Sequence, residues 1–474
     1  MAFRYVLLSV TASAAFVAGC SDGSGRDTDA TTVGPVTDPT TTTGTTTEEA
    51  SSETTDSSSE TSTTEVPTTA GCTPGEEDCI CNLDSCDDGL ECVDDMCVPM
   101  STTTEEPTTE EPTTEDPTTA GEEPLCGDGE PVATELCFNE PITIGMGSGP
   151  ADILAFDLNG DDIDDLITAN SLSNNLTMRQ ALGNAMFGGL SAIEAGAGTS
   201  AVISAAVDNG SDLDLIATNQ GAANLSIFLA TMDGFGPQAN TAVGMGPVEL
   251  ASGDFNKDSI ADVVVVNTTD NNVMFLPGTG LGFGDPVALP TGTTPVDITL
   301  GDFNGDQNLD FVTANGSGTV SVRLGNGGGL FSNNTNIAVA GTPSALATGH
   351  LNADEHLDLA VAVQDEGLVY MLAGDGFGGF TVGIPFDCGP EPSDLILEDF
   401  THDGNLDIAV SNQSVAKVHI LVGTGIGGFE APQPYMVGAS PVALTAGDFN
   451  GDGVLDIATA NSSVATSTVL FANP

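Results

Sequence analysis

The chain has 474 residues and is strongly acidic, with 69 Asp and Glu against six Lys and Arg and a formal charge of −63. A nucleic-acid partner is excluded because phosphate binding needs a basic surface, and charge alone cannot hold the chain on an anionic membrane. Such acidity favours solubility or disorder, but carboxylates at fixed positions would indicate cation binding instead.

Residues 1–19 are predicted to be an export signal that ends before Cys20. An apolar stretch of about 14 residues follows Arg4 and is too short for a permanent membrane span. The sequence Val17-Ala18-Gly19-Cys20 resembles a bacterial lipobox, which implies cleavage there and lipidation of Cys20. With Ser21 next, the resemblance implies an outer-membrane lipoprotein, exposed at the cell surface or facing the periplasm. The alternative is an ordinary signal peptide that happens to contain a cysteine.

Two low-complexity segments, 20–71 and 99–125, are predicted to form a disordered stalk. They consist mainly of Thr, Ser, Glu and Pro, which cannot bury a core, and their like charges extend the chain. The Thr residues leave O-glycosylation open.

A cysteine-rich insert at 72–98 interrupts this stalk. Its six cysteines predict a mini-domain with three disulfides in an oxidising compartment, with the pairing left open. A metal knot is the alternative, but the paired Cys-x-x-Cys spacing of thiolate sites is absent. In the segment 126–138 a further disulfide is expected, and Cys388 is predicted to be a buried thiol. The disulfide candidates are Cys72, Cys79, Cys81, Cys86, Cys92, Cys97, Cys126 and Cys137.

From 139 to 474 the chain repeats about every 48 residues, a period typical of an array of like units. Seven acidic segments each precede a β-branched run, as in GDFNGDGVLDIATAN near the C-terminus. The last aspartates of these segments keep the period: Asp165, Asp214, Asp262, Asp310, Asp358, Asp407 and Asp456.

Each unit contains four short apolar runs between Gly-, Asn- and Pro-rich turns. None suits a helix, and four strands in about 40–50 residues are typical of a propeller blade. The seventh unit ends after its third strand, while a spare strand lies at 139–147. We therefore predict an all-β, seven-bladed propeller of four-stranded blades, closed by this N-terminal strand so that no edge stays open. An open solenoid is the alternative, but no caps are visible.

The acidic loops place oxygen-bearing side chains at positions 1, 3, 5 and 9 and leave the carbonyl at position 7 free. Ca²⁺ prefers about six to eight hard oxygen ligands in a flexible arrangement. An EF-hand would need a later Glu between two helices, whereas position 9 here leads directly into a strand. Facing carboxylates would repel each other in an empty loop, which favours Ca²⁺ over an Asx-rich turn without metal.

The seven loops differ in how many of these ligands they keep. The loop from Asp399 has Thr401, a poorer ligand, at position 3, while Ala206 and His350 replace the first acid of the second and fifth loops. Four or five Ca²⁺ ions are therefore predicted. Their ligands are Asp157, Asn159, Asp161, Asp165, Asp254, Asn256, Asp258, Asp262, Asp302, Asn304, Asp306, Asp310, Asp399, Asp403, Asp407, Asp448, Asn450, Asp452 and Asp456.

These units resemble FG-GAP, or VCBS, repeats over about 139–474. The resemblance rests on the D-x-N-x-D-x-x-x-D loop, the Phe-Gly pairs at Phe187, Phe235 and Phe283, and a Gly-x-x-Pro. Such repeats build the propeller of integrin α-chains and of many secreted bacterial proteins. The resemblance implies Ca²⁺ between the first and second strands of a blade and partners on the opposite face. The loops there follow Asn170, Asn219, Asn267, Asn315, Gln364, Asn412 and Asn461. The alternative role of these Asn is to end strands in turns.

Two classes of function compete: a surface-displayed binding or adhesion module, and an enzyme such as a polysaccharide lyase or hydrolase. Catalysis needs a convergent group of side chains, but the four His do not cluster and Gly-x-Ser-x-Gly is absent. We therefore expect no enzyme. A sugar-stacking lectin is disfavoured because the chain has no Trp and only Tyr370 and Tyr435 beyond the signal.

We expect a monomer that binds an extracellular protein or matrix partner with some positive charge, or else a glycan, and that meets the membrane only through its lipid. A structural coat role is a further alternative, because the fold does not decide function.

Overall fold

The computed structural model describes residues 90–93, 96–99 and 136–473, with gaps at 211 and 233. These residues belong to two units, each described by itself. In the first, β1 (Leu90–Val93) and β2 (Met96–Pro99) form an antiparallel hairpin in which Cys92 and Cys97 are register partners. The signal, the stalk and the other cysteines up to Cys126 lie outside the described residues. Nowhere in the described ranges is there a helix with the length and apolarity of a membrane span.

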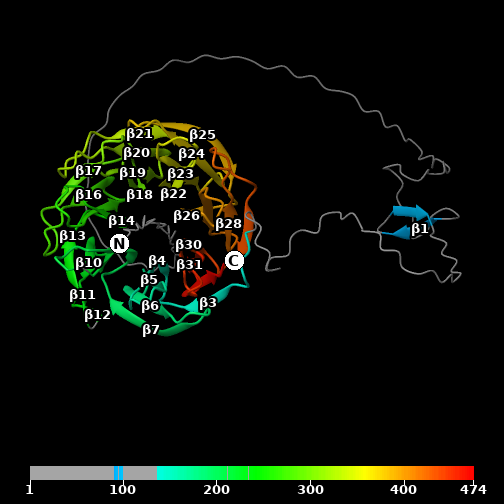
Figure 1. Cartoon of the computed structure of the whole chain (residues 1–474), viewed down its shortest axis with the longest axis horizontal. Helices are drawn as coiled ribbons and strands as arrows, with labels where there is room; N and C mark the ends of the chain where they lie inside the picture. The colour runs from blue at the N-terminus through cyan, green and yellow to red at the C-terminus, as the bar shows by residue number, and fades with distance from the viewer. Residues whose placement is uncertain (1–89, 94–95, 100–135, 211, 233, 474) are drawn as a thin grey trace, which may run out of the picture. The chain divides into compact units, whose positions relative to one another are not determined.

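The second unit is a ring of seven four-stranded antiparallel sheets (Figure 1). The innermost strands are β4 (Pro150–Phe156), β8 (Thr199–Ala205), β14 (Pro247–Gly253), β18 (Pro295–Gly301), β22 (Pro343–Gly349), β26 (Pro392–Glu398) and β30 (Pro441–Gly447). The second strands are β5 (Asp165–Asn170), β9 (Asp214–Asn219), β15 (Asp262–Asn267), β19 (Asp310–Asn315), β23 (Asp358–Val363), β27 (Asp407–Asn412) and β31 (Asp456–Asn461).

The third strands are β6 (Asn175–Ala181), β10 (Asn224–Phe228), β16 (Asn272–Leu276), β20 (Thr319–Arg323), β24 (Leu368–Gly374), β28 (Lys417–Leu421) and β32 (Thr466–Leu470). The outer strands are β7 (Phe187–Glu194), β13 (Ala239–Ala242), β17 (Val287–Pro290), β21 (Thr335–Ala338), β25 (Phe380–Asp387), β29 (Gln433–Met436) and β3 (Ile142–Gly145). A short ribbon, β11 (Ala230–Thr231) with β12 (Gly234–Phe235), extends the second blade.

The predicted closure is confirmed, because the seventh blade has the order β3-β32-β31-β30. The N-terminal strand β3 pairs antiparallel with β32 near the C-terminus, and β30 contacts β4 of the first blade. At the same junction the Asp448 N–H donates to Asp164 Oδ2 at 3.1 Å, and the Asp164 N–H donates to the Asp448 carbonyl at 3.0 Å. Closure therefore joins the two ends of the propeller by strand pairing and by loop contacts.

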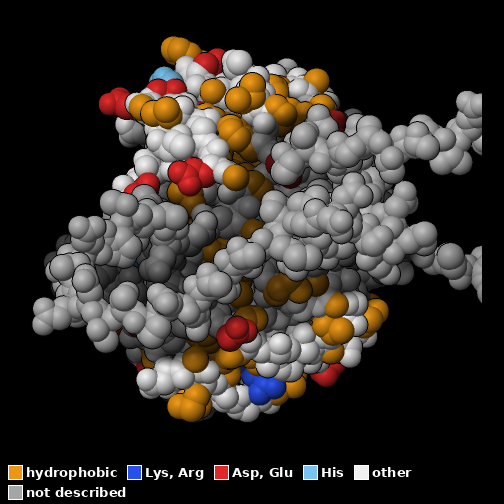
Figure 2. Space-filling model, turned by 90° about the vertical axis from the view of Figure 1, so that its right-hand side faces the viewer, with side chains coloured by type: hydrophobic (Ala, Val, Ile, Leu, Met, Phe, Trp, Pro, Cys, Tyr) orange, Lys and Arg blue, Asp and Glu red, His pale blue; other side chains and the backbone are white. Residues whose placement is uncertain are grey.

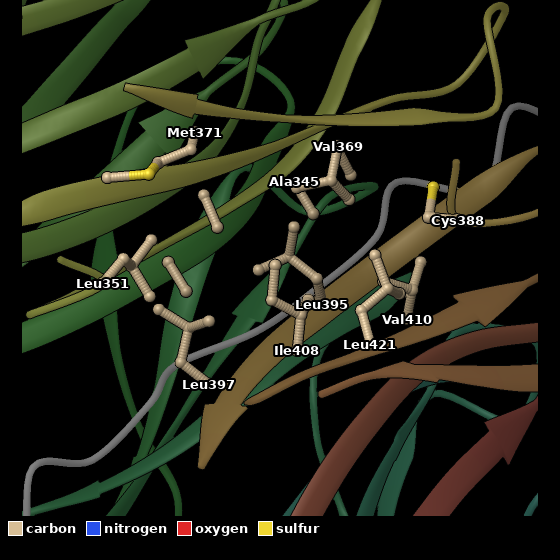
Figure 3. Packing of buried hydrophobic residues seen from close by; sticks show 13 residues of the cluster. Ala345, Leu351, Val369, Met371, Cys388, Leu395, Leu397, Ile408, Val410 and Leu421 are labelled. Carbon is tan, nitrogen blue, oxygen red and sulfur yellow. The ribbon is translucent and has the colours of Figure 1, made fainter. Parts of the chain in front are cut away.

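The second strands are the most deeply buried, with all six residues buried in each of the seven. Both faces of each sheet pack on neighbouring blades, which explains why these strands are continuous apolar runs rather than alternating ones. Figure 3 shows one such interface, where Val369 of blade 5 meets Leu395 and Val410 of blade 6. Cys388 lies in this cluster as a free thiol, as predicted, and burial raises its pKa to about 12.

Acidic side chains on three inner strands join neighbouring blades. Asp152, Asp297 and Asp394 each accept the N–H of the next residue and another N–H from the inner strand of the following blade. For Asp152 the second donor is Val202, 2.8 Å from Oδ2. Each carboxylate therefore pairs two buried donors and connects two blades near the axis of the ring.

Glu249 holds the same place on β14 but is not fully bonded. On the next blade the corresponding N–H, that of Ile298, already donates to Asp297. Glu249 Oε2 is buried and has no hydrogen-bond partner among the described residues. Burial raises the pKa of Glu249 well above its usual value, and the carboxylates of Asp152, Asp297 and Asp394 raise it further.

Candidate metal loops and the face that carries them

The acidic loops connect the first and second strands of each blade, so all seven lie on one face of the ring. In blade 4, Asp302 accepts the N–H of Asp306 at 3.0 Å and that of Gln307 at 2.7 Å. Asn304 Oδ1 accepts the Asp306 N–H, and Asp306 Oδ1 accepts that of Asn308, both at 2.9 Å. These Asx turns hold positions 1, 3 and 5 on the inside of one tight turn.

Two left-handed residues give five of the loops a common backbone. In blade 4 these are Gly305 and Gln307, at positions 4 and 6, with φ of 73° and 64°. The same two positions are left-handed in the loops that start at Asp157, Asp254, Asp399 and Asp448. In the fifth loop, Ala353 and Glu355 are not left-handed. The fifth loop, in which His350 replaces the first acid, therefore also has a different turn.

The aspartate at position 9 is buried and ties the loop to the blade. Asp310 Oδ2 accepts the N–H of Phe303 in the loop at 2.9 Å, and Oδ1 accepts that of Gly325 after the third strand at 2.7 Å. Every blade repeats both bonds. Two donors that burial would leave unpaired are thereby satisfied, so this side chain has a structural role with or without an ion.

Position 9 ionises less readily than an ordinary aspartate. Burial raises the pKa of Asp310 to about 6 and that of Asp456 to about 7. Backbone donors oppose this rise, while the carboxylates at positions 1 and 5 add to it. A cation among these groups would offset both the burial and the repulsion.

The donor chemistry of the five like loops fits a hard cation. Each carboxylate offers about four acceptor sites, and Asp302 gives two of them to backbone N–H groups. In blade 6, Thr401 Oγ1 at position 3 is buried without a partner among the described residues. Across the same residues, no group of three or more His, Cys, Asp or Glu side chains is arranged to hold a metal ion. Binding Ca²⁺ therefore requires the loop side chains to move inward.

The fifth loop has a histidine contact where the others have an acid. His350 Nδ1 lies 3.0 Å from the carbonyl oxygen of His356 and donates to it in the tautomer that carries the proton on Nδ1. His356 is position 7, whose carbonyl Ca²⁺ would need. The His350 imidazole therefore occupies the carbonyl oxygen that a Ca²⁺ ion in this loop would need as a ligand.

The second loop is held by its neighbour. The Ala206 carbonyl accepts the N–H of Ala261 in the third loop, and Asn209 Nδ2 donates to the Gly280 carbonyl at 2.8 Å. These contacts give the loop support without a first acid.

The recurring Phe packs the loop after the third strand onto the acidic loop of the preceding blade. The Phe331 ring of blade 4 lies 5.5 Å from that of Phe255, at position 2 of the third loop. The Gly329 N–H donates to the Phe255 carbonyl at 3.2 Å. Phe380 and Phe303 repeat the ring contact at 5.5 Å one blade later. The Phe-Gly signature therefore marks a contact between blades.

On the opposite face, the Asn at the ends of the second strands are buried in turns. Asn315 Nδ2 donates to the Thr319 carbonyl and to Ser321 Oγ on the third strand. A Cβ on Gly292 would lie 2.6 Å from the Asn315 side chain, so this glycine is needed for the close approach. These Asn side chains therefore end the second strands in turns. The exposed side chains of this face, such as Leu172 and Met245, come from the loops instead.

The remaining predicted residues are also accounted for. Cys137 is buried and disulfide-bonded, while its predicted partner Cys126 lies outside the described residues. His419 is on β28, where its Nδ1 lies 2.6 Å from Asn412 Oδ1, so it serves the Asn turn of its blade.

Sequence reasoning missed a ring of exposed apolar side chains beside the acidic loops. They lie in the loops between third and fourth strands, on the same face, and we call them the apolar tips. The tips are Met186, Met232, Leu281, Leu330, Phe377 and Ile426, each at least 56% exposed. The signal was a lone apolar residue among glycines before the recurring Phe, as in GFGGF and GIGGF. On the side of the molecule in Figure 2, hydrophobic and acidic side chains share the surface and Lys and Arg are rare.

A sequence model described as FG-GAP-like repeat matches residues 254–313, 302–361 and 399–459. No curated protein matches the chain. Among solved structures, BBS1N in complex with ARL6DN is 13% identical, with a TM-score of 0.51, over 72% of this chain and 98% of that one. Virginiamycin B lyase from Staphylococcus aureus is 11% identical, with a TM-score of 0.50, over 70% and 98% of the two chains. At these identities the likeness shows the fold alone.

Proposed function

The chain is an FG-GAP-repeat β-propeller, and from this premise we propose that it is a binding module whose blades are stiffened by Ca²⁺. The observation that carries the calcium assignment is the common turn of five loops, with left-handed residues at the same two positions. In blade 4 the side-chain oxygens of positions 1, 3 and 5 also accept backbone N–H groups within this turn. The first, third, fourth, sixth and seventh loops hold one ion each through positions 1, 3, 5 and 9. When bound, Ca²⁺ neutralises the crowded carboxylates and fixes the loop against its neighbours.

Export and lipidation at Cys20 would present this propeller from the outer membrane on the Thr- and Glu-rich stalk, with an extracellular protein or matrix component as its partner. A lectin that stacks sugars on tyrosine is less well supported. Tyr435 is half-buried, its Oη donates to the Leu136 carbonyl at 2.9 Å, and its ring packs on Phe138. That side chain is therefore used in holding the N-terminal segment. We propose no catalytic activity.

The test is to count bound ions by calorimetry on the full chain and to compare thermal unfolding in Ca²⁺ and in chelator. Five ions and a clear rise in Tm are expected, because a ligand that binds only the folded state stabilises it. An unchanged Tm with no bound ions would overturn the calcium assignment and leave the loops as acidic turns.

A further inference from the structure

We propose that the apolar tips and the acidic loops form one docking surface for a basic protein partner, and that Ca²⁺ holds this surface in shape. The inference deepens the proposed binding function and rests on it for the role of Ca²⁺. It places the partner on the calcium-loop face rather than on the opposite one.

The tips are exposed, although a neighbouring Phe in the same loop is packed between blades. Phe377 is 83% exposed and Ile426 is 77% exposed, each three residues before a Phe that packs into the interface between blades. Singly scattered apolar residues are ordinary on a protein surface, but these side chains recur at the same loop in six blades and on one face, and we infer that they act together as anchors. Six of the seven blades supply a tip, so the tips recur around one face of the ring.

The Phe377 and Ile426 tips are each held by the acidic loop of the preceding blade. The Gly378 N–H beside Phe377 donates to the carbonyl of Phe303, which is position 2 of the fourth loop, at 2.9 Å. The Gly427 N–H beside Ile426 donates in the same way to Leu351 of the fifth loop, at 2.9 Å. An ion that stiffens the fourth loop therefore also fixes the Phe377 tip, whereas the Ile426 tip rests on the loop held by His350.

The charge of this face selects the partner. The acidic loops alternate with the tips around the face, and Lys257 is the one Lys or Arg in the seven acidic loops. One Ca²⁺ cannot neutralise three carboxylates, so the face stays negative when it is loaded. An anionic membrane and a second copy of the same face are both repelled. A protein surface that combines apolar side chains with Lys and Arg is attracted and can bury the tips.

The test measures binding of a helical Leu/Lys peptide, as a stand-in for such a surface, to the full chain by fluorescence anisotropy. The tip variant is Leu330→Ser, Phe377→Ser and Ile426→Ser together. The matched control is Leu172→Ser with Met245→Ser, which removes apolar side chains that are 73% and 57% exposed on the opposite face. We expect the tip variant to weaken binding by roughly 30-fold, the scale of one lost interface hot spot, and the control to leave it unchanged.

Three further measurements extend this test. A Ser/Lys peptide of equal charge should bind more weakly and be indifferent to the tip variant. Phosphatidylserine vesicles and self-association in the ultracentrifuge should show no tip-dependent binding. Chelation, or Asp302→Ala, should weaken Leu/Lys binding, and the loss caused by Asp302→Ala should be larger while Phe377 is present than in Phe377→Ser.

Equal loss in the tip variant and the control, or no loss in either, would overturn the docking surface, as would tip-dependent binding to vesicles or to a second copy. Ion counts on the same samples separate this failure from that of the proposed function. If the chain binds no Ca²⁺ yet the tip variant still loses the peptide, the calcium assignment falls while the docking surface stands.

Discussion

The loops of blades 4 and 5 have the same place in the fold but different chemistry. Both end in a buried aspartate, Asp310 or Asp358, which accepts one N–H from position 2 and one from the end of the third strand. They differ at position 1, where blade 4 has Asp302 bonded to backbone N–H groups and blade 5 has His350 bonded to a carbonyl.

This difference separates two roles of the acidic loop. Position 9 holds the blade together in both loops and needs no ion. Positions 1, 3 and 5, with left-handed residues at positions 4 and 6, form the turn suited to a cation, and blade 5 lacks that turn while keeping position 9. Structural support and ion binding can therefore be altered independently.

The largest expected effect comes from removing position 9. Asp358→Ala leaves the buried N–H groups of Leu351 and Gly374 unpaired, at about 1–3 kcal/mol each. Asp310→Ala should lose a similar amount of unfolding free energy in chelator, as measured by urea denaturation. If both variants kept their unfolding free energy in chelator while Asp310→Ala lost stability in Ca²⁺, position 9 would act only through an ion.

A smaller loss is expected from Asp302→Ala, which removes the first ligand of the fourth loop. Bound Ca²⁺ should fall by one ion, and stabilisation by Ca²⁺ at 100-fold excess over Kd should fall by about 2.7 kcal/mol. The exposed acid Glu430 provides the control, since Glu430→Ala should change neither quantity. An unchanged ion count in Asp302→Ala would remove the fourth loop from the assignment.

The converse change should create a site in blade 5. His350→Asp combined with Ala353→Gly and Glu355→Gly restores the first acid and permits left-handed positions 4 and 6. One additional ion is expected, with about 1.4 kcal/mol of added stabilisation when Ca²⁺ is tenfold above Kd. Calorimetry decides this, and Ala353→Gly with Glu355→Gly alone is the control that should bind no extra ion.

The smallest effect concerns Glu249, an acid near the axis that lacks the full bonding of position 9. Its folded pKa is raised by burial and by the neighbouring carboxylates, so its contribution to stability is complete below the unfolded pKa of about 4.3 and is lost as pH rises toward the folded pKa. In chelator, Glu249→Gln should therefore reduce the loss of Tm between pH 5 and pH 8. An identical pH profile in both proteins would show that Glu249 ionises freely in the folded state.

Much of the fold was predictable because its signals are local and repeated. The spacing from Asp165 to Asp456 indicated seven units, and the spare strand at 139–147 indicated closure by β3 (Ile142–Gly145). The deficient loops at Ala206 and His350 were also visible, since a missing acid stands out against the other copies. In contrast, nothing local to Asp152 or Phe331 identifies Val202 or Phe255 as its partner on another blade.

The number of blades, the β class, the closing strand and the loops with oxygen ligands all follow from residue type and spacing along the chain. Three features emerge only from the folded chain: position 9 is a buried support, the recurring Phe joins blades, and the apolar tips lie beside the acidic loops. The physical reason is that these features depend on contacts across a strand pair or between blades. Packing of adjacent blades brings together residues from different repeats, such as Asp152 with Val202 and Phe331 with Phe255, and these partners cannot be read from either segment alone.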